Sequence, residues 1–121
     1  MESELLGKIS EEISKIVTYE YGEYTGKLVY PYGVGEYSEG SYSYEDNGTT
    51  GSFILTLFNR GNELELIDIK EKIKKVFADY RANTESGTIY VGYRNKLFLR
   101  SGEAELKKIE IYLDTMYWEG E

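Results

Sequence analysis

Residues 52–80 constrain the fold most strongly, because they combine an apolar strand, a short polar turn and a long amphipathic helix. Residues 52–59 are rich in β-branched and aromatic side chains and almost free of charge, which is typical of a strand covered on both faces. After the turn at residues 60–62, Asn62 and Glu65 have the spacing of a capping box, in which the Asn62 side chain accepts from the Glu65 N–H. Apolar side chains then recur with helical spacing at Leu66, Ile69, Ile73, Val76, Phe77 and Tyr80. We therefore expect a central strand followed by a helix that packs back on the sheet.

Two further segments carry clear periodicity. Residues 3–17 predict a helix with Ser3 as its N-cap and an apolar stripe at Leu5, Leu6, Ile9, Ile13, Ile16 and Val17. Residues 106–118 alternate between apolar and polar, which predicts a half-buried strand beside the central one. Its expected core-facing side chains are Ile109, Ile111, Leu113 and Tyr117.

Shorter strands are expected on either side of the central unit. Residues 28–30 read as a strand that ends at Pro31, since proline is confined to sheet edges and bends. Residues 88–93 and 96–100 predict two strands joined through Arg94 and Asn95 in a short hairpin.

The segment between the first helix and the central strand has an unusual composition. Residues 19–51 contain eight of the thirteen tyrosines and seven of the thirteen glycines. We expect residues 33–51 to form a long hairpin arm that stands off the domain, because this stretch is too rich in glycine for a core strand. Tyr37, Tyr42 and Tyr44 suit an ordered contact arm, since tyrosine supplies large contact area at low entropic cost. A flexible surface loop is the alternative.

The order of elements predicts one α+β domain over residues 1–121, with two helices packed on one face of a mainly antiparallel sheet and a Tyr/Gly-rich arm. A chain of 121 residues suits one such core. We further expect Arg94, Lys96 and Arg100 to face an acidic surface of a neighbouring subunit.

Composition argues against an enzyme. The chain has no cysteine and no histidine, which removes thiolate ligands, disulfides and the usual general base near neutral pH. The carboxylate pairs Glu103–Glu105 and Glu45–Asp46 are more typical of solvated turns than of acid–base or metal sites. We expect no catalytic residue, cofactor or metal.

Charge and hydropathy set further expectations. The net charge of −8 argues against free nucleic-acid binding, which needs a basic surface. No apolar run approaches the roughly 20 residues of a membrane span, so no membrane association is expected.

The whole pattern resembles the tail-terminator or tail-completion proteins of long-tailed bacteriophages and prophages, which join tail to head. The resemblance lies in the N-terminal helix, the Tyr30-Pro31-Tyr32 segment, an acidic Gly-containing excursion to Gly48, the strand at residues 53–58, the turn at 60–62, the helix at 66–80, a short hairpin and the terminal strand at 109–118.

This resemblance implies a structural virion protein, located in the tail and assembled in the host cytoplasm. It would act as a homo-oligomeric ring, expected to be a hexamer, that contacts the tail tube protein and the head-proximal connector. DNA would pass through an acidic bore without specific binding. The alternative from another class is a small acidic binding protein, such as a toxin immunity protein or an inhibitor that mimics nucleic acid.

Overall fold

The computed structural model describes residues 1–27, 29–43, 45–99 and 105–120. Its elements in chain order are α1 (Glu2–Ser14), β1 (Thr18–Tyr21), β2 (Tyr32–Ser43), β3 (Gly48–Arg60), α2 (Glu63–Phe77), β4 (Tyr80–Asn83), β5 (Gly87–Leu99) and β6 (Leu106–Glu119). Neither of these helices is long and apolar enough to cross a membrane.

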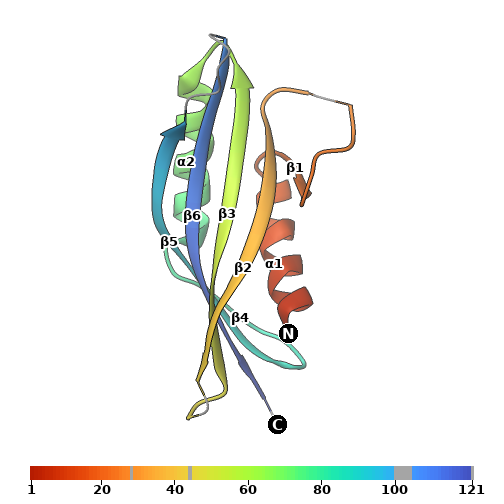
Figure 1. The fold of residues 1–121 in the computed structure, drawn as a ribbon, viewed down its shortest axis with the longest axis vertical. Coiled ribbons are helices and arrows are strands. Elements are labelled where there is room, and N and C mark those ends of the chain that lie inside the picture. The colour runs from red at the N-terminus through yellow and green to blue at the C-terminus, as the bar shows by residue number, and fades with distance from the viewer. Residues whose placement is uncertain (28, 44, 100–104, 121) are drawn as a thin grey trace.

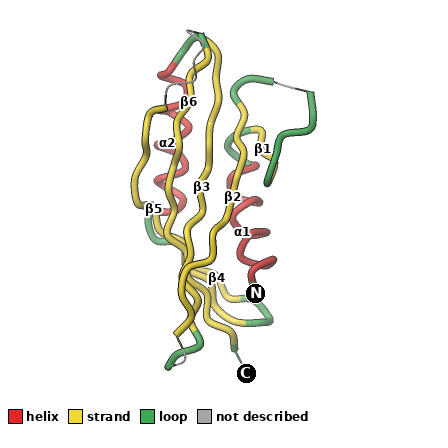
Figure 2. Tube along the Cα trace, in the orientation of Figure 1, coloured by secondary structure: helices red, strands yellow, loops and turns green. Residues whose placement is uncertain are grey.

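The strands form one strongly twisted sheet in the order β1-β2-β3-β6-β5-β4 (Figures 1 and 2). Only the β1–β2 pair is parallel, and the other four pairs are antiparallel. The α+β class and the mainly antiparallel sheet with two helices are thus confirmed. The predicted neighbourhood of the central strand and the terminal strand is also confirmed, because β3 pairs with β6 along its whole length.

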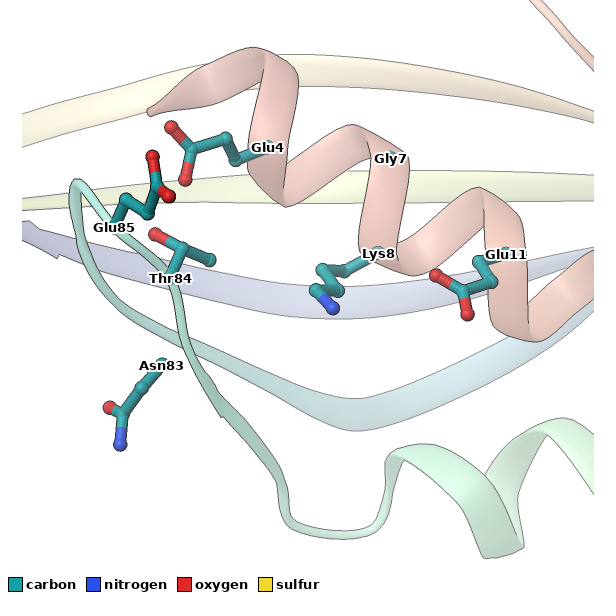
Figure 3. Close-up of a pocket in the computed structure, with 7 residues that line it drawn as sticks. All are labelled: Glu4, Gly7, Lys8, Glu11, Asn83, Thr84 and Glu85. Carbon is teal, nitrogen blue, oxygen red and sulfur yellow. The ribbon is translucent and has the colours of Figure 1, made fainter.

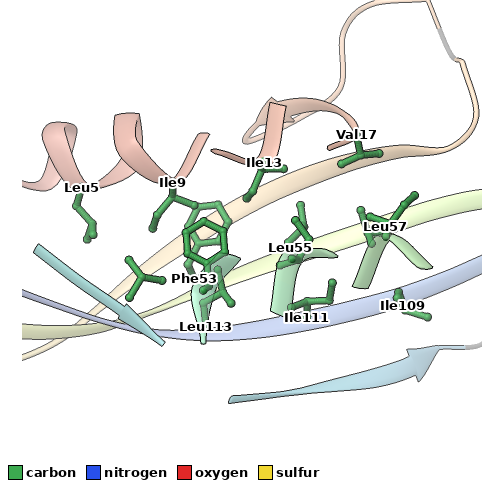
Figure 4. Packing of buried hydrophobic residues seen from close by; sticks show 14 of the residues in the cluster. Leu5, Ile9, Ile13, Val17, Phe53, Leu55, Leu57, Ile109, Ile111 and Leu113 are labelled. Carbon is green, nitrogen blue, oxygen red and sulfur yellow. The ribbon is translucent and has the colours of Figure 1, made fainter. Parts of the chain in front are cut away.

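A single core joins both helices to one face of the sheet. Figure 4 shows the part of this core between α1 and the sheet. The register pairs Phe53 with Leu113, Leu55 with Ile111 and Leu57 with Ile109, so these six side chains share a face. Both helices contribute fully buried side chains to the same core, namely Leu5, Ile9 and Ile13 from α1 and Leu66, Ile73 and Phe77 from α2. The apolar stripes were therefore interpreted correctly within α1 and α2, but both helices end earlier than predicted: Ile16 and Val17 lie beyond α1, and Tyr80 is the first residue of β4.

The helix starts differ in detail from the predictions. Asn62 is the N-cap of α2 as expected, but its side-chain oxygen accepts from the Leu64 N–H at 2.8 Å rather than from Glu65. For α1 the prediction was wrong, since Met1 and not Ser3 is the N-cap and no side-chain hydrogen bond closes the first turn.

The expected arm that stands off the domain is not confirmed. Residues 32–39 of β2 pair with residues 51–58 of β3 without interruption, and Gly33 and Gly35 are buried. The glycines leave space for rings from other strands. A Cβ on Gly35 would lie 2.5 Å from the Tyr19 hydroxyl oxygen, and one on Gly51 would lie 2.5 Å from the Tyr37 hydroxyl oxygen. The Tyr/Gly composition thus reflects tyrosine rings that cover strand glycines.

Three strand assignments also need correction. β5 is one continuous strand, because a bulge between Tyr93 and Asn95 absorbs the expected turn and both halves pair with β6. Strands β1 and β4, each four residues long, were not predicted. The expected strand at residues 28–30 is not present at Val29 and Tyr30, and β2 begins only after Pro31, which has no N–H to donate.

Candidate functional site on the uncovered face of the sheet

The second face of the sheet carries no helix among the described residues, since α1 and α2 both pack on the first. The register places Ile54 opposite Tyr112, Thr56 opposite Glu110 and Phe58 opposite Lys108 on this second face, and all six are only partly exposed. β3 was expected to be covered on both faces. One of its faces is open instead, although it carries Ile54 and Phe58.

Four aromatic rings gather at one end of this face. Tyr32 lies at the centre, with ring centroids 4.6 Å from Tyr24, 5.4 Å from Tyr30 and 4.8 Å from Phe58, on which it stacks. Burial raises the pKa of Tyr32, and the neighbouring tyrosines raise it further. Tyr32 therefore remains a neutral phenol well above neutral pH.

A cavity of about 500 Å³ opens beside these rings. Tyr24, Tyr32 and Phe58 form its aromatic wall. Its charged side chains are the carboxylates of Glu23, Glu36 and Glu110 and the ammonium of Lys108. The Lys108 Nζ lies 5.5 Å from the centre of the Phe58 ring, in the geometry of a cation–π contact. We name this space the aromatic–acidic cavity.

Farther along the same face, Arg94 is held by three groups. Its Nε lies 3.2 Å from the Asp114 carboxylate, its Nη2 donates to the Ser52 hydroxyl at 3.5 Å, and its guanidinium lies 5.6 Å from the centre of the Tyr112 ring. The Tyr112 hydroxyl donates to Glu110 at 2.7 Å, and this bond raises the pKa of Tyr112. The uncovered face therefore already binds one guanidinium between an aromatic ring and a carboxylate.

The predicted interaction residues do not form one patch. Arg94 lies on the uncovered face, but Tyr37 lies on the helix-covered face and packs against the core. Tyr42 lies near the tip of the β2–β3 hairpin, where its hydroxyl donates to Asn47 at 2.8 Å. Lys96 pairs with Ile111 and so shares the helix-covered face.

The two remaining predicted residues, Tyr44 and Arg100, lie outside the described residues. The residues that line the aromatic–acidic cavity were not predicted as a site. One signal was available in the sequence. The strand β3 has the apolar residues Ile54 and Phe58 on the face opposite Phe53, Leu55 and Leu57, whereas the expected domain had helices on one face only.

A second cavity, of about 490 Å³, lies between α1 and the β4–β5 turn (Figure 3). Its lining includes Glu4 and Glu11 of α1 and Glu85 of the turn. Glu4 accepts from the Ser86 hydroxyl at 2.6 Å, and this hydrogen bond lowers the pKa of Glu4. This contact tethers the start of α1 to the turn, which gives Glu4 and Ser86 a structural role.

Of the two carboxylate pairs considered from sequence, the structure describes both members of Glu45–Asp46 only. Asp46 accepts from the Gly48 N–H at 2.9 Å and from the Trp118 indole at 3.3 Å, so it closes the hairpin turn. Glu103 lies outside the described residues. Within the described part of the chain, no three Asp, Glu, His or Cys residues lie close enough together to bind one metal ion.

No protein-family model matches the sequence, and no curated protein is significantly similar to it. The uncovered face of the sheet is therefore the feature from which a function can be argued.

Proposed function

We propose that this protein is a structural component of a bacteriophage tail that caps the tail tube or joins the tail to the head as a homo-oligomeric ring. The observation that carries the proposal is the uncovered face of the sheet. On this face Ile54 and Phe58 of β3 and Tyr112 of β6 are partly exposed beside charged side chains, and a surface that mixes aromatic and polar side chains in this way suits a protein partner.

The arrangement suits a ring. Closed rings are built from heterologous contacts, in which two different surfaces of each subunit meet. The helix-covered face and the uncovered face of this domain are such a pair, with a Lys-rich second half of α2 on one and acidic side chains on the other. The net charge of −8 per chain would make the bore of a ring strongly negative, which favours passage of DNA without binding.

Tail proteins of this kind perform no chemistry. The partners in this proposal are further copies of the chain, expected to make a hexamer, the tail tube protein and the connector of the head. The protein would reside in the virion tail after assembly in the host cytoplasm.

A small acidic binding protein is the second candidate, and the aromatic–acidic cavity favours it. Three carboxylates beside three aromatic rings suit a basic segment of a target such as a toxin. Such a protein would bind its target as a monomer or dimer.

Native mass spectrometry separates the two candidates. The first predicts a closed ring of several subunits, expected to be six, and tubes of uniform length when the protein is expressed with the tube protein of the same genome. A monomer or dimer that leaves tube length unchanged would contradict the tail proposal and favour the binding protein.

A further inference from the structure

We propose that the aromatic–acidic cavity binds the guanidinium group of an arginine presented by a basic segment of a partner protein. The inference is carried by the cavity and its surroundings, and it does not require that the protein forms a ring.

The size and wall of the cavity suit such a group. A volume of about 500 Å³ is enough for an arginine side chain together with part of the backbone that carries it. Tyr32 stacks on Phe58, Tyr24 lies 4.6 Å from Tyr32 between ring centres, and the three rings together form one wall of the cavity. Planar guanidinium groups stack on such surfaces, where the ring quadrupole attracts the positive charge.

The charge of the cavity selects a cation. Its lining holds three carboxylates against one ammonium, and the whole chain carries −8. Glu36 is exposed and Glu110 and Glu23 are accessible from the cavity, so a ligand can reach them without a buried charge being created. Anionic ligands, including phosphate groups, are disfavoured by the same arrangement.

The same face shows twice how it binds a guanidinium. Arg94 lies over the Tyr112 ring and pairs with Asp114. Arg60 lies over Tyr30, next to the cavity, at 5.4 Å from the ring centre. Both arrangements combine arginine with tyrosine, and the cavity offers this pairing once more, with tyrosines and carboxylates contributed by β2, β6 and the segment after β1.

Arginine is favoured over lysine for a geometric reason. The guanidinium is a planar fork that can donate two parallel hydrogen bonds to one carboxylate while its face lies on a ring. The ammonium group of lysine is compact and has no planar face that could stack on a ring. A lysine from the partner would also add a second ammonium beside that of Lys108.

The test is a titration of the purified protein with the peptide acetyl-Gly-Arg-Gly-Arg-Gly-amide, followed by calorimetry and by backbone amide shifts. We expect saturable binding with shifts confined to the cavity-lining parts of β2, β3, β6 and the segment after β1. The Glu36→Gln/Glu110→Gln double variant should bind roughly tenfold more weakly. The Tyr24→Ala variant should also bind more weakly although no charge is changed, and thermal melting of both variants verifies that they remain folded.

Matched controls keep the result specific. The Glu11→Gln/Glu45→Gln variant removes two exposed carboxylates far from the cavity and should bind like the parent. A citrulline peptide, which has the shape of the arginine peptide without its charge, should not bind.

Four results would each overturn the inference. These are an equal loss in the Glu11→Gln/Glu45→Gln control, binding of the citrulline peptide, equal binding of the matching lysine peptide, and no saturable binding up to about 1 mM peptide.

Discussion

Replacement of Gly35 by alanine tests the packing that the sequence did not reveal. Gly35 is buried in β2, between the Tyr19 ring of β1 and the Phe53 ring of β3. A new methyl group would lie 2.5 Å from both the Phe53 Cζ and the Tyr19 hydroxyl oxygen. Phe53 is fully buried, and the Tyr19 hydroxyl accepts from Ser10 at 3.1 Å, so neither ring can move freely.

The magnitude follows from this geometry. Carbon contacts are optimal at about 3.5–4.0 Å, so the methyl group needs about 1 Å of relief. Overpacking of this kind costs about 1–3 kcal/mol, and the reduced freedom of the unfolded chain returns about 0.4–1 kcal/mol. We expect Gly35→Ala to lower the free energy of unfolding by about 1–2 kcal/mol. With an m-value of about 2 kcal/mol/M, the urea midpoint should fall by about 0.5–1 M.

Gly7→Ala is the matched control, because it adds the same methyl group where nothing lies within 4 Å of the new Cβ. This residue lies inside α1, so alanine should raise the free energy of unfolding by about 0.5–1 kcal/mol. If Gly35→Ala is as stable as the parent while Gly7→Ala behaves as expected, the two rings do not lie against Gly35. The packing of β1 and β3 around Gly35 described above would then be wrong.

Three other measurements probe the core, a buried polar pair and a titrating turn. Ile73→Ala leaves a cavity beneath α2, where Ile73 is fully buried, and chemical denaturation should show a loss of about 2–5 kcal/mol. The buried hydroxyls of Tyr37 and Thr115 lie beside each other without a well-formed hydrogen bond, so Tyr37→Phe combined with Thr115→Val should leave the melting temperature unchanged or raise it. Hydrogen bonds from Gly48 and Trp118 hold the pKa of Asp46 below its ordinary value of 3.8, so its stabilising effect is complete above that pH and is lost as the pH falls through the lowered pKa. Fluorescence of Trp118, the one tryptophan in the chain, should follow this step with a midpoint below 3.8, and Asp46→Asn should abolish it.

Local patterns predicted the parts of the fold that depend on local sequence. The stripes of both helices and the alternation of residues 106–118 repeat with the period of their element, and each repeat points to one buried face. Asn62 was recognisable as a cap for the same reason, since its role depends on the next few residues. The α+β class follows from these elements and their order.

Long-range contacts explain what was missed. The glycines of β2 argue against a core strand when only the local sequence is considered. In the fold, Tyr19 and Phe53 from other strands cover Gly35, and this contact is not encoded in the neighbouring residues. Arg94 and Asn95 have the composition of a turn. Because the long strand β6 pairs with the residues on both sides of them, the chain continues as one strand with a bulge and does not reverse direction. The apolar character of β3 on both faces was interpreted as two covering layers, whereas one of its faces remains open.

Hydroxyl-radical footprinting of the assembled particle against the dilute monomer tests the central claim, which is that the uncovered face is the assembly surface. We predict that Tyr32, Phe58 and Tyr112 are oxidised more slowly in the particle, because their partly exposed rings become covered by a neighbour. If these three side chains react at the same rate in both states, the uncovered face is not used in assembly and the proposed function loses its support.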